Sequence, residues 1–317
     1  MMKTDIIPLG TSSATPTRTR ALSATALQRA GRILLFDCGE GTQFRLMEAG
    51  LSPARIDAVF ITHLHGDHFF GLPGLLTTLS LNRRLDPITI AGPAELGTIL
   101  QQIPGVGEHE LTFPIHFVEL REGFGRETMM ETPDYRVVAR PLDHRVFTAG
   151  YRFEEAPTPG TLDVMRARAL GITDYLHFRE LKAGRDVRLP DGEVVRSREV
   201  VGPQQKGSSF AYLFDTRPCP SGVELARDVD LVFHDATFLE KHHQRARHTG
   251  HSTAVEAAHI AEQAGAHRLL LGHFSARYQS VQPLVEEAQR IFKNTDAAEE
   301  LKRYSLETVR RNPSEGV

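Results

Sequence analysis

A short turn in the first quarter of the chain carries the residues best suited to metal chemistry. Residues 62–68 read Thr-His-Leu-His-Gly-Asp-His and place three imidazoles and one carboxylate together. Residues 58–61 before them are apolar and predict a short buried strand, so the turn opens where a strand ends. Imidazole with carboxylate suits Zn²⁺, with Mn²⁺ as a substitute, and the absence of thiolate argues against an iron–sulfur centre. A solvated His-rich loop is the alternative interpretation, which this density of ligands behind a strand disfavours.

The spacing within this turn predicts more than one metal ion. His63 and His65 are two residues apart, so in extended backbone their side chains point the same way. Asp67 and His68 lie one step further round the turn. A single strand end can therefore offer ligands to two adjacent ions.

Four later apolar runs are also followed directly by metal-type residues. They are residues 142–144 (Leu-Asp-His), 213–216 (Leu-Phe-Asp-Thr), 233–236 (Phe-His-Asp-Ala) and 271–274 (Leu-Gly-His-Phe). The strands of one sheet bring their ends to a common edge, so we expect His144, Asp215 and His273 to converge on the turn at His63. Taken alone, each is better explained by a structural role. As a set, they supply the ligands that a two-metal centre still lacks.

The elements that would position these residues alternate along the chain. Strands are predicted at residues 6–9, 24–27, 33–36, 58–61, 135–139, 209–214, 231–233 and 268–271, and helices at 42–49, 69–81, 93–102 and 163–170. The third of these helices has Pro93 in its first turn. The clearest helix opens at Thr253, whose Glu256 completes a capping box, and stops at Gly265. The mixture predicts an α/β (α+β layered) fold with two sheets rather than a doubly wound one.

Composition limits the class of protein. A chain of 317 residues with 40% apolar content can bury a large core, as one domain or as one domain with an insertion. Cys38 and Cys219 are too few for a disulfide framework, and we expect both to be reduced. No secretory signal or membrane-spanning run is visible, so we expect a soluble, cytoplasmic protein. The net charge of −3 argues against a surface that coats nucleic acid as a whole, but it allows a local basic patch.

Residues 152–206 predict an inserted arm, because prolines and glycines break up this part of the chain. Its inner part, residues 166–188, holds six basic and three acidic residues, a local charge of +3. On charge alone, an ordinary solvent-exposed insertion explains these residues equally well as a binding surface. The candidate substrate-binding residues here are Arg166, Arg168, Arg179, Lys182 and Arg185.

Several longer segments are similar to those of a known family. They are residues 9–16 (LGTSSATP), 36–43 (FDCGEGTQ), 62–76 (THLHGDHFFGLPGLL), 150–153 (GYRF), 250–253 (GHST) and 275–278 (SARY). Nearly the whole chain therefore resembles the metallo-β-lactamase superfamily and, within it, the ribonuclease Z family, which trims the 3′ end of precursor tRNA. The resemblance implies a metallo-β-lactamase αββα sandwich as a single domain over residues 1–317. Residues 152–206 would form a flexible arm that serves as a tRNA-binding exosite.

The resemblance also implies which residues hold the metal ions. The first Zn²⁺ would be held by His63, His65 and His144. The second would be held by Asp67, His68 and His273, and Asp215 would bridge the two ions. Two cations about 3.5–4 Å apart can deprotonate a bridging water at neutral pH and stabilise charge on the phosphate oxygens during in-line displacement.

Proton transfer would involve three residues. Asp67 is implied as the proton acceptor that orients the attacking hydroxide, and His251 as the acid that protonates the leaving 3′-oxygen. Asp235 would support His251, at a position where the family usually has Glu. The nearby histidines without a catalytic role are His234, expected to be structural, and His242, His243 and His248, expected in an exposed loop.

The arm departs from the family pattern in part. Residues 181–184 (Leu-Lys-Ala-Gly) match the segment that the family uses to grip the tRNA elbow. Residues 173–176 (Thr-Asp-Tyr-Leu) stand where the family has a run rich in proline and glycine. Phe214 stands where the family usually has a small residue, and Ala21 stands where many members have Asn. These differences concern the grip on the substrate rather than the metal chemistry.

The predicted function is a zinc phosphodiesterase that acts as a tRNA 3′-endonuclease. It would leave a 3′-hydroxyl on the tRNA and a 5′-phosphate on the trailer, as a homodimer in which one subunit's arm serves the other's active site. One alternative is a hydrolase of small phosphodiesters or sulfate esters that shares the metal ions but not the tRNA specificity. A second is a catalytically silent RNA-binding scaffold, which is disfavoured because no expected ligand is missing.

Overall fold

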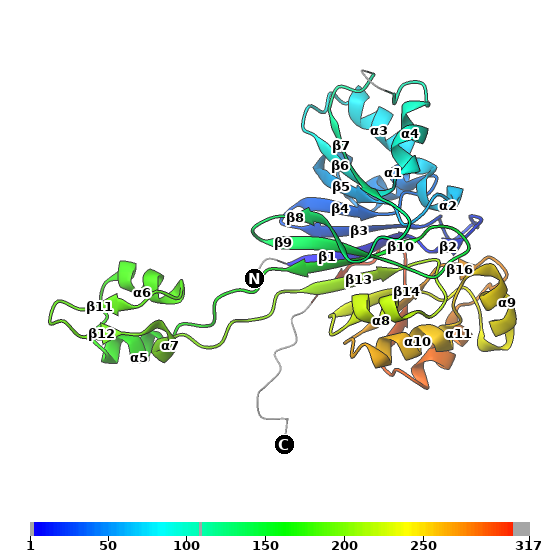
Figure 1. Cartoon of the computed structure of the whole chain (residues 1–317). Helices are drawn as coiled ribbons and strands as arrows, with labels where there is room; N and C mark the ends of the chain where they lie inside the picture. The colour runs from blue at the N-terminus through cyan, green and yellow to red at the C-terminus, as the bar shows by residue number, and fades with distance from the viewer. Residues whose placement is uncertain (1–2, 108–109, 307–317) are drawn as a thin grey trace. The chain divides into compact units, whose positions relative to one another are not determined.

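The computed structural model describes residues 3–107 and 110–306, which fall into two compact units. The smaller unit consists of residues 133–135 and 154–207, and the larger unit contains the other described residues. The larger unit is layered: a set of helices, two stacked sheets and a second set of helices follow one another (Figure 1).

The first sheet of the larger unit contains seven strands. In spatial order they are β18 (Tyr304–Ser305), β1 (Thr4–Gly10), β3 (Ala24–Arg29), β4 (Arg32–Phe36), β5 (Ile56–Phe60), β6 (Ile88–Pro93) and β7 (Ile115–Leu120). The neighbours from β4 to β7 run parallel, whereas β3 pairs antiparallel with β1 and β4. One face is covered by α1 (Thr42–Glu48), α3 (Gly71–Leu81) and α4 (Glu95–Gln101), whose leucines share a buried cluster with the strands.

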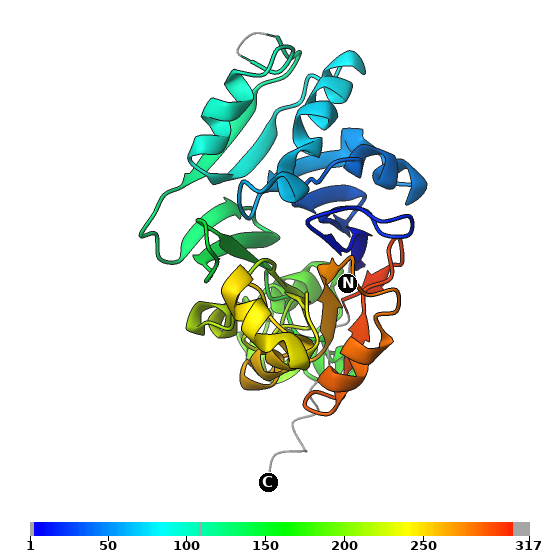
Figure 2. The same ribbon diagram turned by 90° about the vertical axis from the view of Figure 1, so that its right-hand side faces the viewer.

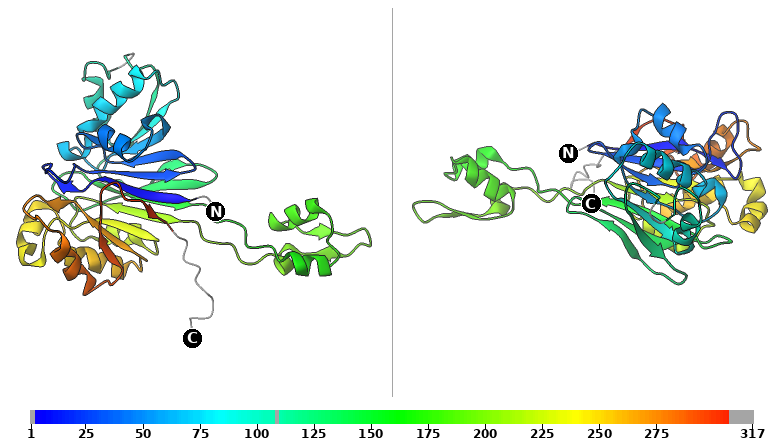
Figure 3. Two further views of the ribbon diagram at one scale, coloured as in Figure 1. Left: turned by 180° about the vertical axis from the view of Figure 1, so that it is seen from behind. Right: turned by 90° about the horizontal axis from the view of Figure 1, so that it is seen from above.

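The second sheet also contains seven strands. In spatial order they are β17 (Thr295–Ala297), β15 (Leu269–Gly272), β14 (Leu231–Asp235), β13 (Ser209–Leu213), β10 (Ala149–Glu155), β9 (Tyr135–Pro141) and β8 (Glu127–Glu131). The neighbours β13, β14, β15 and β17 run parallel. The outer face packs against α8 (Pro220–Ala226), α10 (Ala254–Gln263) and α11 (Gln282–Gln289), and the view from behind shows the same layers (Figure 3).

Aromatic side chains fill the space between the two sheets. Phe36 of β4 contacts Tyr151 of β10 as well as Phe210 and Tyr212 of β13, at ring-centroid distances of 5.6 to 6.1 Å. Phe60 of β5 lies 5.5 Å from Tyr151. All these rings are fully buried, and such pairs stabilise a core beyond the area that they bury. Because alternate strand residues face opposite layers, each sheet packs on its helices and on the other sheet, and the predicted αββα sandwich is confirmed.

The predicted elements are found, with two main differences, both in helices. The helix predicted over residues 69–81 is two helices, α2 (Gly66–Phe69) and α3, so the His-rich turn itself begins a helix. The helix predicted over residues 93–102 begins at Glu95, because Pro93 is the last residue of β6. None of the helices in the described part of the chain combines the length and hydropathy that a bilayer crossing needs.

The predicted capping box of α10 is confirmed. The Thr253 N–H donates to Glu256 Oε2 at 2.8 Å, and the Glu256 N–H donates to Thr253 Oγ1 at 3.2 Å. Gly265, just beyond the helix, has φ 63°, the left-handed conformation that favours glycine at this position.

The smaller unit has a hydrophobic core of its own. Its elements are α5 (Val164–Ala169), α6 (Tyr175–Lys182), β11 (Val187–Arg188), β12 (Val194–Val195) and α7 (Ser197–Val200), which bury Ala167, Ile172, Leu181, Val187, Val195 and Val200. The arm predicted over residues 152–206 differs slightly in its bounds, because Arg152 and Phe153 belong to the larger unit and Gly207 to the smaller one. Asp174 caps α6 by accepting the Leu176 N–H at 2.8 Å, so residues 173–176 form a helix start.

Candidate metal centre

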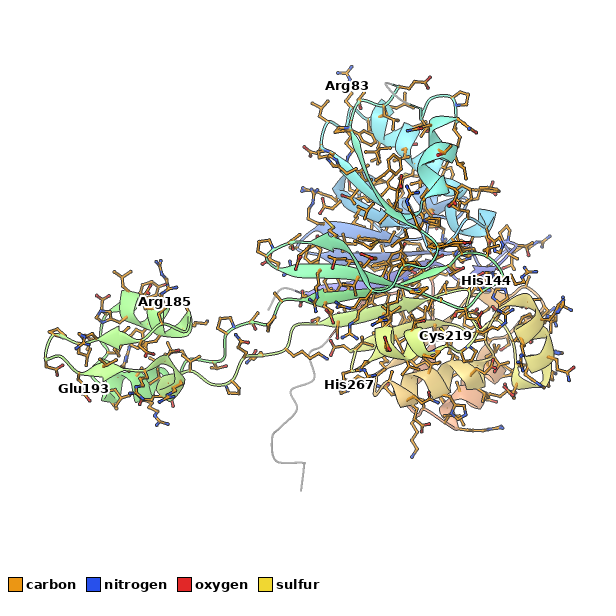
Figure 4. The ribbon with its side chains drawn as sticks, in the orientation of Figure 1. Arg83, His144, Arg185, Glu193, Cys219 and His267 are labelled. Atoms are coloured by element: carbon orange, nitrogen blue, oxygen red, sulfur yellow. The ribbon has the colours of Figure 1, made fainter. Side chains whose placement is uncertain are left out.

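The seven predicted ligands lie in segments that follow strands of both sheets. In chain order they are His63 and His65 after β5, Asp67 and His68 in α2, His144 between β9 and β10, Asp215 after β13, and His273 after β15. Figure 2 looks onto this end of the sheets, with α9 (His243–Thr249, yellow) in front, and Figure 4 labels His144 there. The structure therefore brings together residues that are far apart in the sequence.

Strand ends at this site carry unusual backbone. Asp37 after β4, Asp215 after β13 and His273 after β15 have φ values of 57°, 50° and 56°. Left-handed backbone costs residues other than glycine on the order of 1–2 kcal/mol each. It persists where the surrounding structure fixes it, commonly at functional sites. Its occurrence at three strand ends, each at a residue with a metal-type side chain, agrees with a functional site here.

The ligand atoms form two groups, and Asp215 faces both. His63, His65, His144 and Asp215 make one group and Asp67, His68 and His273 the other, with the ligand atoms of each group within 4.8 Å of one another. Oδ2 of Asp215 lies 3.5 Å from His63 Nε2 and 3.7 Å from His144 Nε2. Oδ1 lies 3.2 Å from His68 Nε2 and 2.9 Å from His273 Nε2. Asp215 thus stands where a bridging carboxylate would stand.

The residues present fit divalent metal ions. Among the described residues, His144 Nε2 is buried without a hydrogen-bond partner, although such atoms are nearly always satisfied in folded proteins. His68 Nε2 lies only 3.3 Å from His273 Nε2. The two ring nitrogens therefore point toward one another instead of each pointing toward a separate hydrogen-bond acceptor. Buried imidazole and carboxylate atoms that converge in this way are ligands of the kind that Zn²⁺ and Mn²⁺ accept.

Burial and charge support this interpretation. Burial lowers the pKa of His63 well below its usual range and that of His144 to about 4, so both imidazoles are neutral at pH 7, as metal ligands must be. Burial alone would raise the pKa of Asp215, but His273 and His68 outweigh it and hold this pKa well below its usual range. Asp215 and other carboxylates raise the pKa of His68 well above its usual range despite burial. The buried negative charge therefore favours a cation at this position.

His251 and Asp235 form a pair beside the two ligand groups, and with Asp215 and His273 they make a third group whose ligand atoms lie within 4.8 Å of one another. His251 Nδ1 lies 2.9 Å from Asp235 Oδ2, and the ring of His251 lies 5.2 Å from those of His144 and His273. Burial raises the pKa of Asp235, but His251 outweighs it and holds this pKa well below its usual range. Within the described part of the chain, Nε2 of His251 makes no hydrogen bond, so this nitrogen is the one left to meet a substrate.

Asp37 belongs to the site, although the sequence reasoning gave it no role. Its buried Oδ2 lies 2.7 Å from His68 Nδ1 and accepts the Tyr212 hydroxyl at 3.1 Å. Its Oδ1 accepts the Thr62 N–H at 2.8 Å. A carboxylate on the far nitrogen of a ligand imidazole fixes the tautomer and the orientation of the ring. The available signal was its place directly after the apolar run at residues 33–36, the same feature that identified Asp215.

Two further contacts hold ligand imidazoles and were also missed. His144 Nδ1 donates to the Gly250 carbonyl at 2.6 Å, and a Cβ added at Gly250 would lie 2.4 Å from that nitrogen. Gly250 has φ 84°, so the close approach and the backbone both require glycine. Thr237 Oγ1 lies 3.0 Å from His273 Nδ1 and donates to Asp235 Oδ1 at 2.6 Å. No local sequence pattern shows these contacts, because each joins two distant segments.

The five predicted substrate-binding residues all lie exposed in the smaller unit. Arg185, labelled in Figure 4, is paired with Glu180, whose Oε1 accepts from Nη2 at 2.9 Å, so its charge is already balanced. No ion pair within the described residues involves the other four, which are Arg166, Arg168, Arg179 and Lys182.

The remaining histidines differ in part from the prediction. His234 is buried, and its Nδ1 donates to the Asp235 carbonyl at 2.8 Å, which agrees with a structural role. For His242, His243 and His248, the predicted exposure is found at His243 and His248, and His242 is half-buried. The predicted loop is wrong, because His242 lies in a 3₁₀ turn at Glu240–His242 and the other two lie in α9. The helix α9 ends at Gly250, which has the left-handed conformation that favours glycine at a helix C-terminus.

Comparisons with known proteins agree with the fold and the site. Residues 4–103 match the family model of the anti-Pycsar protein Apyc1, and residues 172–274 match that of the beta-lactamase superfamily domain. The crystal structure of the short form of human tRNase Z is 29% identical, covers 96% of this chain and 99% of its own, and has a TM-score of 0.70. The metallo-beta-lactamase fold protein YhfI from Bacillus subtilis, 18% identical, covers 96% of this chain and 100% of its own with a TM-score of 0.68. This chain is therefore a protein of the metallo-β-lactamase fold.

Curated relatives narrow the class further. Ribonuclease Z of Salinibacter ruber is 51% identical over 98% of this chain and 97% of its own length. Ribonuclease Z of Geobacillus kaustophilus is 40% identical over 95% of this chain and 99% of its own length. The chain belongs to the ribonuclease Z family.

Proposed function

We propose that this protein is a metal-dependent endoribonuclease that cleaves the 3′ trailer from precursor tRNA. It leaves a 3′-hydroxyl on the tRNA and a 5′-phosphate on the trailer, which makes it a hydrolase of the tRNA 3′-endonuclease type. Membership of the ribonuclease Z family supports this function. The observation that carries it is Asp215, which faces two ligand groups beside the pair of His251 and Asp235. Two metal ions next to a free imidazole suit in-line phosphodiester cleavage.

The proposed cofactor is a pair of Zn²⁺ ions, with Mn²⁺ as a substitute. The first ion would be held by His63, His65 and His144. The second ion would be held by Asp67, His68 and His273, and Asp215 would contact both ions. When bound, the pair would lower the pKa of a water molecule and stabilise charge on the phosphate oxygens.

Asp67 and His251 would carry the protons. Burial raises the pKa of Asp67, but His68 and His273 outweigh it and hold this pKa well below its usual range, so the carboxylate is ionised and can accept a hydrogen bond from the attacking water. It would take the proton of that water once bound cations had lowered the pKa of the water. The bond from phosphorus to the tRNA 3′-oxygen then breaks, and its electron pair stays on that oxygen. His251 donates a proton to this oxygen from Nε2, while Asp235 at Nδ1 stabilises the charged imidazole.

The smaller unit would supply affinity for the tRNA. Its four unpaired cations suit contact with phosphates, whose counterions are released on binding. The cations are Arg166, Arg168, Arg179 and Lys182. We place Arg185 outside this set because Glu180 already neutralises it.

We also propose a homodimer in the cytoplasm, in which one subunit's arm serves the other's active site. Phe44 and Met47 on α1 are three residues apart, share one helix face and are 59% and 58% exposed. Large exposed apolar side chains on one face suit burial against a second copy of the chain. Light scattering of the purified protein should give the mass of a dimer, and a monomer at micromolar concentration would contradict the proposal.

The test of the activity compares two substrates. The metal-loaded protein should release the trailer from a precursor tRNA, and Asp67→Ala should abolish this cleavage while the melting curve still shows a folded protein. Asp57→Ala is the matched control, because it removes a partly exposed carboxylate that pairs with Arg32 on the sheet. Cleavage of bis-p-nitrophenyl phosphate alone would favour a hydrolase of small esters, and cleavage of neither substrate would favour an RNA-binding scaffold.

A further inference from the structure

The loop between β1 and β3 contacts Asp67 through one main-chain group. We call residues 11–21 the N-terminal loop. Within it, the Ala14 N–H donates to Asp67 Oδ2 at 2.8 Å, and Ala14 has the left-handed φ of 61°. A left-handed alanine needs the rest of the loop to hold it. The same Oδ2 lies 3.5 Å from His68 Nε2 and 3.7 Å from His273 Nε2, so the loop contacts the oxygen that faces the second ligand group.

Both ends of the N-terminal loop are held by one carboxylate from the C-terminal part of the chain. Glu300 Oε1 accepts the Thr11 N–H at 3.0 Å, the Thr11 hydroxyl at 3.0 Å and the Ala21 N–H at 2.9 Å. Glu300 Oε2 accepts from Arg45 Nη2 at 2.7 Å, and Arg45 Nε donates to the Leu9 carbonyl at 3.0 Å. The Glu300 side chain is only 9% exposed. A buried charged acceptor with four donors holds its partners strongly.

The N-terminal loop is also tied to the segment that follows His273. Ser12 and Ser13 pair in parallel with Phe274 and Ser275. Arg20 Nη2 donates to the Tyr278 carbonyl at 2.9 Å. The loop therefore contacts Asp67 itself and the segment that follows His273, two residues of the same ligand group. A shift of the loop would change the distance between these two side chains.

We infer that Glu300 is a positioning residue for the second metal site. By fixing both ends of the N-terminal loop, it holds the Ala14 N–H against Asp67 and sets the direction in which that carboxylate points. Glu300 acts through the loop and is not itself one of the ligand-group residues. The role deepens the proposed function and rests on the assignment of Asp67 made there.

Two substitutions test the role by metal binding. Glu300→Gln keeps the size of the side chain and removes its charge, and Glu300→Ala removes the acceptor. Each should weaken binding of the more loosely held Mn²⁺ by about 10-fold or more, as the loss of supporting contacts to metal ligands does. Each should also lower kcat for precursor tRNA more than it raises KM, because Asp67 acts on the reacting atoms. Calorimetric titration of the metal-depleted full-length protein with Mn²⁺ measures the affinity without a substrate.

A neighbouring residue gives the matched control. Glu299 has a side chain 67% exposed, which pairs with Lys302 at the surface. Glu299→Gln should leave Mn²⁺ affinity, kcat and KM unchanged. If the wild-type protein binds two ions and cleaves tRNA, and Glu300→Ala behaves like Glu299→Gln, the positioning role alone would be overturned. A wild-type protein that neither binds metal nor cleaves RNA would instead overturn the proposed function.

A double substitution separates positioning from general stability. If Glu300 acts through Asp67, Glu300→Ala should change Mn²⁺ affinity by less than about twofold when it is added to Asp67→Ala. The same loss of affinity in both backgrounds would mean that Glu300 supports the fold as a whole, and the inference would be wrong. Melting temperatures of all variants, compared with Glu299→Gln, show whether each remains folded.

Discussion

Three ligand imidazoles are oriented by groups that would touch no metal ion. The Gly250 carbonyl contacts His144, Asp37 contacts His68, and Thr237 contacts His273, each at the nitrogen turned away from the ligand group. Because the far nitrogen fixes the tautomer of a ligand imidazole, these groups decide which nitrogen is free to bind. The metal site therefore extends beyond the seven predicted ligands.

Gly250→Ala should damage the first metal site. The added Cβ would lie 2.4 Å from His144 Nδ1, so the imidazole must move and its bond to the carbonyl is lost. We expect kcat to fall by about 10- to 100-fold, together with the metal content measured by atomic absorption. Gly123→Ala is the control, because Gly123 has a similar φ of 80° with open space around it. Equal activities of the two variants would show that the contact with His144 has no function.

Asp235→Asn should separate proton transfer from metal binding. The amide cannot stabilise a charged His251 as the carboxylate does, so kcat should fall by about 10²-fold or more. Asp235 is outside the proposed ligand set, so the metal content of the variant should match that of the wild type. Kinetics and metal analysis of the same preparation check both expectations. Loss of a metal ion in this variant would mean that Asp235 acts as a ligand.

The candidate ligands could be predicted from the sequence because each follows an apolar run, as with Asp215 after β13 and His273 after β15. Asp37 has the same placement, but it stands alone in its segment and no nearby histidine drew attention to it. Gly250 and Thr237 act through a carbonyl and a hydroxyl that meet a distant segment. Only the folded chain shows such contacts, since neither residue type suggests them.

At the scale of the element, periodicity predicted most strands and helices, and tertiary contacts decided the rest. The break between α2 and α3 is made by main-chain bonds to Cys38, whose N–H donates to the His68 carbonyl at 2.7 Å and whose carbonyl accepts the Gly71 N–H at 2.9 Å. A Cβ at Gly71 would lie 2.1 Å from the Gly39 carbonyl. The helical pattern of residues 69–81 carries no sign of this approach, so the single predicted helix was wrong.

The layer between the two sheets should make stability depend on alkaline pH. Burial raises the pKa of Tyr151 and Tyr212 well above the usual range, so both stay protonated in the folded state. In the unfolded chain they ionise near the ordinary value of 10.0, which favours unfolding as the pH rises above that value. The free energy of unfolding should then fall by about 1.4 kcal/mol per pH unit for each tyrosine.

Thermal melts between pH 8 and pH 11 check this expectation. Tyr151→Phe should flatten the alkaline part of the curve, because one ionising group is removed. Tyr175→Phe, which changes a side chain 75% exposed in the smaller unit, should leave the curve unchanged. Identical curves for the two variants would exclude Tyr151 as a source of the pH dependence.

At the scale of the whole molecule, the smaller unit should be separable from the chemistry. Each unit has its own buried core, so replacement of residues 157–202 by a short linker should leave the larger unit folded. We expect KM for precursor tRNA to rise by about 10-fold or more while turnover of bis-p-nitrophenyl phosphate is unchanged. The salt dependence of tRNA binding should also become weaker, because phosphate contacts are lost.

Two single substitutions refine this test. Arg179→Ala should weaken tRNA binding more than Arg185→Ala does, because Glu180 already neutralises Arg185. Binding titrations at several salt concentrations measure both effects. The reverse order would mean that the ion pair opens and that Arg185 is the residue that contacts phosphate.

Each ligand group combines residues that follow strands of both sheets. His63 of the first group and His68 of the second come from one layer, while His144 and His273 come from the other. A bound ion would therefore add a further link between two layers that are joined by aromatic packing and by hydrogen bonds such as that from Tyr212 to Asp37. At a free concentration of 100 times its Kd, one ion adds about 2.7 kcal/mol to the free energy of unfolding. Chelation should lower the melting temperature and speed amide exchange at the ends of β5 and β13 more than within α10, so that metal loading would also determine how long the folded protein survives.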